Sequence, residues 1–197
     1  MERLNFEASS AFAIFWNMLK THAPASVMED TDKFFTGIGI HRMDGNQRLS
    51  GSKGRYVIEI DGVPVEFYDV ELAPPCGVFG VNYARSTHFE KQPHKYAMSW
   101  TTGRTLGRNH GGHFYVSRFG IRVQGAPNTL VIWKPGYKHG TSLQKLSPFD
   151  PAPHFMQTGM SIVTSGRIRK IWEKYKATGV AEPKDYLPEE IDSDDDE

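Results

Sequence analysis

Between residues 55 and 164 the hydrophobic pattern alternates in short runs, and each run is bounded by a tight turn. Asp61-Gly62 separates Arg55–Ile60 from Val63–Val70, and an Asp-Gly pair between two alternating runs is a strong hairpin signal. Further strands are predicted at Val78–Arg85, Tyr96–Thr102, His113–Ser117, Gly120–Gln124, Thr129–Trp133, Gly140–Leu143 and Met160–Thr164. Many short strands with few helices predict a β-sandwich, a jelly roll or a barrel.

Helical periodicity is confined to two segments that flank the strands. One follows a predicted serine N-cap at Ser9 or Ser10, runs to about His22 and is ended by Pro24. The other is Arg167–Lys176, where apolar residues form one stripe. The predicted fold class is therefore mainly β with flanking helices, an α+β protein.

The zero formal charge of the 197-residue chain conceals a basic body and an acidic end. Residues 189–197 hold seven of the 23 acidic residues, so the other 188 residues carry 23 Lys and Arg against 16 acids, a net +7. We expect an N-terminal helical segment over 1–35, a strand-rich domain with a C-terminal helix over 36–176, and a disordered acidic tail over 177–197. A second reading has this tail covering the basic body and competing with an anionic ligand.

Composition also bounds the class of protein and its surroundings. No apolar run approaches the roughly 18 residues that a membrane helix needs, and the first residues do not resemble a signal peptide. The single cysteine, Cys76, excludes an internal disulfide. We therefore expect an intracellular protein, nuclear or cytoplasmic, with no membrane partner. A polar, glycine-rich loop is predicted over residues 43–54.

Histidines gather in the strand-rich region, where six of the eight fall between residues 88 and 154. In His88-Phe89-Glu90, an extended backbone would turn the imidazole and the carboxylate to the same face. The pair follows a predicted strand, and His139 stands 51 residues later at the start of another. Two histidines and one carboxylate form the facial triad of non-haem iron oxygenases. The other reading is that these are ordinary loop histidines.

Several segments together carry a family resemblance. They are Val81-Asn82-Tyr83, His88-Phe89-Glu90, Gly111-Gly112-His113-Phe114, Asn128–Trp133 and His139-Gly140-Thr141-Ser142. In this order the chain resembles the Fe(II)/2-oxoglutarate-dependent dioxygenase superfamily, and most closely its Tet/base-J-binding-like branch, which is expanded in fungi. The resemblance covers about residues 63–166.

The resemblance implies a double-stranded β-helix, or jelly-roll core, that holds Fe(II) inside one end of a barrel. It would make His88, Glu90 and His139 the metal ligands and catalytic residues, with 2-oxoglutarate chelating the metal. It would also place Asn82 and Tyr83 in the pocket, as part of the co-substrate site. The implied reaction is hydroxylation of a C–H bond, with a methylated nucleobase as the substrate suggested by family likeness.

Two positions depart from the family pattern. Glu90 stands where the family usually has an aspartate. The last predicted core strand lacks the arginine or lysine that commonly pairs with the far carboxylate of 2-oxoglutarate. No cation stands at the expected position, but Arg167 lies just beyond that strand and Lys145 follows His139 by six residues. Arg85 and Arg122 are the other cations that could point into the pocket. If none of them reaches the pocket, the alternative is a catalytically silent β-helix that binds a partner and has lost the co-substrate anchor.

Two further features have more than one reading. His110 and His113 flank a Gly-Gly turn, and they are either a second metal pair or incidental members of a hairpin. Cations interleaved with aromatic residues would suit the phosphate backbone of a nucleic acid, or would simply be a solvated basic face. These cations are Lys91, Lys95, Arg104, Arg108, Arg118, Arg122, Lys134, Lys138 and Lys145.

Overall fold

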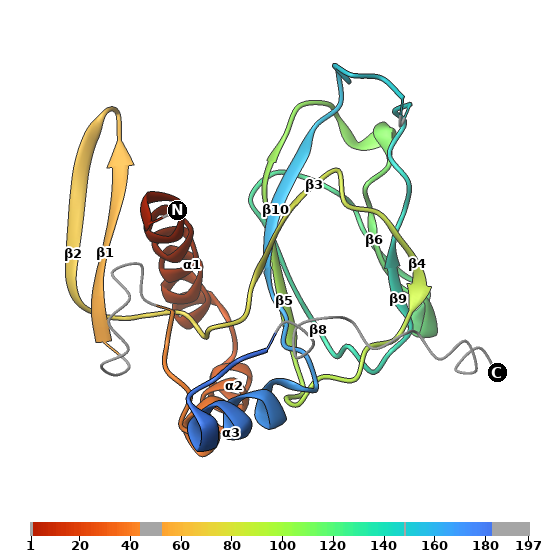
Figure 1. Cartoon of the computed structure of the whole chain (residues 1–197). Helices are drawn as coiled ribbons and strands as arrows, with labels where there is room; N and C mark the ends of the chain where they lie inside the picture. The colour runs from red at the N-terminus through yellow and green to blue at the C-terminus, as the bar shows by residue number, and fades with distance from the viewer. Residues whose placement is uncertain (1, 44–52, 148, 183–197) are drawn as a thin grey trace. The chain divides into compact units, whose positions relative to one another are not determined.

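The computed structural model describes residues 2–43, 53–147 and 149–182, which combine helices with antiparallel sheets (Figure 1). The predicted α+β class is confirmed. The chain divides into two compact units, residues 1–165 and residues 166–197. The second unit contains α3 (Ile168–Thr178), so the predicted C-terminal helix is confirmed. Most of the polar loop predicted at 43–54, and residues 183–197 of the acidic tail, lie outside the described residues.

Eight strands form the body of the first unit. They are β3 (Val78–Val81), β4 (Arg85–His88), β5 (Ala97–Arg104), β6 (Phe114–Val116), β7 (Ile121–Val123), β8 (Thr129–Trp133), β9 (His139–Thr141) and β10 (Gln157–Ile162). The short 3₁₀ turns η1 (Arg108–His110) and η2 (Ser117–Phe119) precede β6 and β7. All strand pairs are antiparallel, in two four-stranded sheets of order β3-β10-β5-β8 and β4-β9-β6-β7.

The pairing within this body is nested. The first strand pairs with the last, β4 with β9, β5 with β8, and β6 with β7. The chain is thus folded back on itself as one long antiparallel ribbon, and successive rungs of the ribbon belong to alternate sheets. This arrangement brings the start of β9 beside the end of β4, where His139 is the register partner of His88.

The prediction of one continuous strand over Val78–Arg85 is wrong, because this segment contributes to two strands, β3 and β4, that belong to different sheets. Asn82 adopts a left-handed backbone conformation with φ of 53° and ends β3. Asparagine tolerates this conformation better than most residues, so it can make the turn. β4 then starts at Arg85 in the other sheet, which displaces the expected strand end by three residues and includes His88 in β4.

The N-terminal helices differ from the prediction in two ways. α1 spans Glu2–His22, so Ser9 and Ser10 are buried inside it rather than capping it, and the Ser9 hydroxyl donates to the Phe6 carbonyl. α2 (Ala25–Ile38) was not predicted as a separate helix, although it overlaps the helical segment expected over 1–35. Its buried residues Val27, Met28, Thr31, Phe35 and Ile38 recur at helical spacing, a signal present in the sequence.

The core joins α1 to the β3–β10–β5–β8 sheet. Phe12, Phe15, Trp16 and Leu19 are almost fully buried, and they share a cluster with Met98, Met160 and Ile162 from β5 and β10. The other face of α1 packs on the predicted hairpin, which is present as β1 (Lys53–Ile60) and β2 (Val63–Glu71) around the Asp61-Gly62 turn. None of the helices within the described residues is both long and apolar enough to cross a membrane.

Removal of the Trp16 side chain is expected to be the most damaging change to this core. Trp16 is 0% exposed, and its indole N–H donates to the Glu71 carboxylate at 2.8 Å. Trp16→Ala should lower the free energy of unfolding by about 3–5 kcal/mol, measured by urea denaturation. Leu4→Ala, at a position 68% exposed on the same helix, should change it by less than about 0.5 kcal/mol. Equal losses in both variants would contradict this account of the core.

Candidate metal centre

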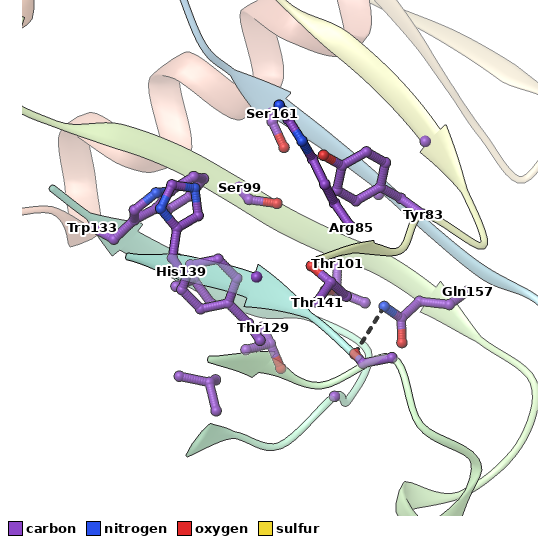
Figure 2. A pocket seen from close by; sticks show the side chains of 18 of the residues that line it. Tyr83, Arg85, Ser99, Thr101, Thr129, Trp133, His139, Thr141, Gln157 and Ser161 are labelled. Atoms are coloured by element: carbon purple, nitrogen blue, oxygen red, sulfur yellow. Dashed lines mark hydrogen bonds between the residues drawn. The ribbon is translucent and has the colours of Figure 1, made fainter. Parts of the chain in front are cut away.

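A pocket of about 400 Å³ lies between the two sheets, and each of the eight strands contributes lining residues (Figure 2). Valine and aromatic side chains make much of its wall. Hydroxyl groups also line it, from Tyr83, Ser99, Thr101, Thr129, Thr141, Thr158 and Ser161. A mostly apolar cavity with a few convergent polar groups is the usual form of a small-molecule site.

His88, Glu90 and His139 meet at this pocket. One ligand atom from each of the three lies within 4.8 Å of the other two. His88 ends β4 and His139 begins β9, so the antiparallel pairing of these strands sets the two imidazoles together, with ring centroids 4.4 Å apart. Glu90 follows two residues after His88, and its backbone N–H donates to the Pro135 carbonyl at 2.9 Å. The structure therefore brings the predicted triad together.

The hydrogen bonds of His88 leave two acceptors facing each other. Nδ1 of His88 lies 2.7 Å from the Ser86 carbonyl oxygen, which can only accept, so Nδ1 carries the proton. In the neutral imidazole Nε2 is then an acceptor, and it lies 3.3 Å from Oε1 of Glu90. These two atoms are close enough to bind the same metal ion.

His139 also presents a ring nitrogen that could bind a metal ion. Its side chain is buried, and Nδ1 donates to the Tyr137 carbonyl at 2.8 Å, which leaves Nε2 as the acceptor. Burial lowers the pKa of His139, so the imidazole stays neutral at physiological pH. A neutral imidazole whose second nitrogen donates to a carbonyl is the form in which histidine binds metal ions.

The donor set of this centre therefore fits one divalent transition metal. Two imidazole nitrogens and one carboxylate oxygen suit Fe(II) and related ions, and three protein ligands leave coordination positions for other groups. His88, Glu90 and His139 would hold the metal. The remaining wall of the pocket would surround whatever binds beside it.

The structure distinguishes among the four cations that the sequence offers as candidates to pair with the far carboxylate of 2-oxoglutarate. Among the described residues that line the pocket, Arg85 is the one Lys or Arg, and its Nη1 donates to Glu90 Oε1 at 3.0 Å. Lys145 is exposed after β9 and does not line the pocket. Arg122 is exposed on β7, also outside the lining. Arg167 belongs to the second unit, at the N-cap of α3.

Tyr83 and Asn82 have different placements. Tyr83 lines the pocket, whereas Asn82 is absent from its lining. The Asn82 side chain instead braces the turn between β3 and β4. Its Oδ1 accepts from the Gln157 N–H at 2.8 Å, and its Nδ2 donates to the Phe155 carbonyl at 3.3 Å.

The His110–His113 pair has a local structural explanation. His113 Nδ1 accepts a hydrogen bond from the Gly125 N–H at 3.0 Å, and His110 Nδ1 lies 3.1 Å from the Gly107 carbonyl. A side chain on Gly111 would collide with the Leu143 carbonyl, and φ of 78° at this position favours glycine. The Gly-Gly turn therefore serves the backbone path.

Two other residues at or beside the site are not indicated by any sequence pattern. Gln157 lines the pocket, and its amide nitrogen donates to the Gly112 carbonyl (Figure 2). Its amide oxygen accepts from Arg104. Gln92 donates to Oε2 of Glu90 at 3.1 Å. Gln157 contacts residues far from it in the sequence, and an isolated glutamine has no signature of such contacts. Gln92 could have been suspected only from its place two residues after Glu90.

The stability of the protein should fall at mildly acidic pH. Burial lowers the pKa of His94, His113 and His139. Below the ordinary imidazole value of about 6.5 the unfolded chain binds protons that the folded protein does not, so acid favours unfolding. The free energy of unfolding, measured in urea without metal, should decrease from pH 7.5 to 5.5 by at most about 1.4 kcal/mol per histidine per pH unit. His94→Gln should reduce this slope, and a slope of opposite sign would contradict the prediction.

Comparisons of the chain with protein-family models, with curated proteins and with solved structures found no match.

Proposed function

We propose that the eight-strand body is a double-stranded β-helix and that the protein is an Fe(II)- and 2-oxoglutarate-dependent oxygenase. The nested pairing of β3 with β10, β4 with β9, β5 with β8 and β6 with β7 supports the first part. An antiparallel ribbon of eight strands wound into two four-stranded sheets is the arrangement of a jelly roll.

The observation that carries the function is the position of the triad. His88, Glu90 and His139 converge within 4.8 Å at a pocket large enough for a small organic acid beside a metal ion. The chain also resembles the dioxygenase superfamily, whose triad maps onto the same three residues. Bound Fe(II), with 2-oxoglutarate and oxygen, would supply hydroxylation of a C–H bond together with release of succinate and carbon dioxide.

The protein's own residues would bind and orient the co-substrate. Arg85 is the cation available to its far carboxylate, and the hydroxyls of Ser99, Thr101 and Ser161 line the same pocket. The family places this cation on the last core strand, but β10 (Gln157–Ile162) carries none. Arg85 on β4 would therefore take the role from a different strand.

A non-catalytic binding module is the second candidate function. It is favoured by the ion pair that already engages Arg85 with Glu90. If Arg85 remained paired with Glu90, no Lys or Arg among the described pocket residues would be available to bind 2-oxoglutarate. The protein would then keep the barrel and the metal site without turnover.

An anionic partner such as a nucleic acid is proposed on the basis of charge near the centre. Arg118 and Lys134 lie over the ring of Tyr137, at 5.1 and 5.9 Å from its centroid, and Tyr137 is two residues from His139. Cations gathered on an aromatic ring suit phosphate and base contacts. A methylated nucleobase is the substrate that the family resemblance suggests.

Anaerobic addition of Fe(II) and then 2-oxoglutarate tests the proposal. The oxygenase should develop the weak visible charge-transfer band of the chelated metal, and oxygen should then yield succinate. Binding of iron without the band and without succinate would reject the oxygenase and leave the binding module.

A further inference from the structure

Both oxygens of the Glu90 carboxylate are engaged in the structure. Oε1 accepts from Arg85 at 3.0 Å and faces His88 Nε2 at 3.3 Å, while Oε2 accepts from the side-chain amide of Gln92 at 3.1 Å. Glutamate has one more rotatable bond than aspartate, so a glutamate ligand needs more restraint to present one oxygen to a metal. The Gln92 contact supplies that restraint, because it holds Oε2 and leaves Oε1 facing His88.

Gln92 is itself held at its other end. Its Oε1 accepts from the backbone N–H of Thr164 at 3.2 Å. Thr164 is 2% exposed, and its hydroxyl is 2.8 Å from Nε2 of the buried His94. Gln92 therefore joins the segment after β4 to the segment after β10, and these strands belong to different sheets.

The chemistry of these two partners selects an amide at position 92. The Glu90 carboxylate can only accept and the Thr164 N–H can only donate, so the residue between them must offer one donor and one acceptor. A glutamate would set two carboxylates against each other, and a lysine or arginine would leave the Thr164 N–H unpaired. An asparagine carries the same amide, but its side chain is one methylene shorter, so the amide would not reach both groups. Glutamine meets both demands in a single orientation.

We propose that Gln92 is a positioning residue for the metal centre. It fixes the Glu90 side chain so that Oε1 faces His88 and His139, and it compensates for the extra flexibility of glutamate at this place. The inference rests on the proposed metal centre, and Gln92 acts only through Glu90. Such outer contacts typically change metal affinity by about 10–100-fold.

A double-mutant cycle on metal affinity tests the inference. Co(II) is titrated anaerobically into the full chain, with its visible absorption as the readout, for wild type, Gln92→Met, Glu90→Ala and the double variant. Gln92→Met keeps the side-chain length and removes both hydrogen bonds. It should weaken Co(II) binding about 10–100-fold in wild type and less than about twofold in the Glu90→Ala background. Gln92→Asn should show a similar loss and replaces Gln92→Met if that variant does not fold.

The outcomes distinguish the inference from the proposed function. Asn17→Ala is the matched control, because the Asn17 amide on α1 also donates to two backbone carbonyls, those of Ala13 and Glu71, and this variant should bind Co(II) as wild type does. Unchanged affinity in Gln92→Met, or the same loss in both backgrounds, would overturn the positioning role alone. Wild-type affinity in His88→Ala would overturn the metal centre, and the positioning role with it.

Discussion

His139→Ala should abolish specific metal binding. The side chain is 3% exposed, is held through Nδ1 by the Tyr137 carbonyl, and offers Nε2 beside His88. Its loss leaves one imidazole and one carboxylate, which do not retain a divalent ion at a specific site. We expect Co(II) affinity to fall more than about 100-fold, beyond the range for outer contacts. The charge-transfer band with Fe(II) and 2-oxoglutarate should disappear with it.

Two further variants make this result interpretable. His110→Ala removes an imidazole whose described contacts are the Gly107 carbonyl and the Phe155 ring, so affinity and band should persist. His139→Gln preserves more of the buried volume, and it should fold wherever His139→Ala is destabilised by the cavity. The metal centre would be rejected if His139→Gln, shown to be folded by circular dichroism, bound Co(II) as tightly as wild type.

Arg85→Gln should change the affinities for metal and for 2-oxoglutarate in opposite directions. The guanidinium lies 3.0 Å from Glu90 Oε1, where it competes with a metal ion for the ligand and repels its charge. Its side chain is 48% exposed, so the pair is worth at most about 1 kcal/mol, and its removal should tighten Co(II) binding up to about fivefold. The affinity for 2-oxoglutarate should fall about 10–100-fold, because a charge-assisted contact to its carboxylate is lost.

Because the two affinities are expected to change in opposite directions, the proposed role of Arg85 can be distinguished from a general loss of structure. A misfolded pocket would lose both affinities together, as measured by Co(II) absorption and by the band that 2-oxoglutarate produces. Arg122→Gln is the matched control, because Arg122 is exposed on β7 and outside the pocket lining. If Arg85→Gln bound 2-oxoglutarate as wild type does, the anchor would be assigned to another residue or the binding module would be favoured.

Local periodicity was sufficient for much of the fold and for the triad as a hypothesis. The Asp61-Gly62 hairpin, β8 and α3 follow from patterns contained within each segment, so they could be predicted without knowledge of their neighbours. The spacing of His88 and Glu90 likewise depends only on an extended backbone. α2 was not predicted as a second helix although its apolar spacing is visible, because Pro24 indicates the end of α1 and the sequence around it does not show that the same proline stands at the N-cap of another helix.

The sequence alone was sufficient to predict a strand-rich region that contains most of the histidines. Side-chain alternation and turn residues are local signals that extend over only a few positions, so they can be recognised without knowledge of the tertiary structure. The tertiary structure alone decided that Asn82 sends the chain into a second sheet and that His139 lies opposite His88. It also placed Arg85 and Gln92 on the two oxygens of Glu90. The pairing of His139 with His88 depends on which distant strands pair, and that choice is made by burial summed over the whole core. The contacts of Glu90 with Arg85 and Gln92 are close in sequence, but they depend on the path of the chain after β4, which side-chain alternation does not predict.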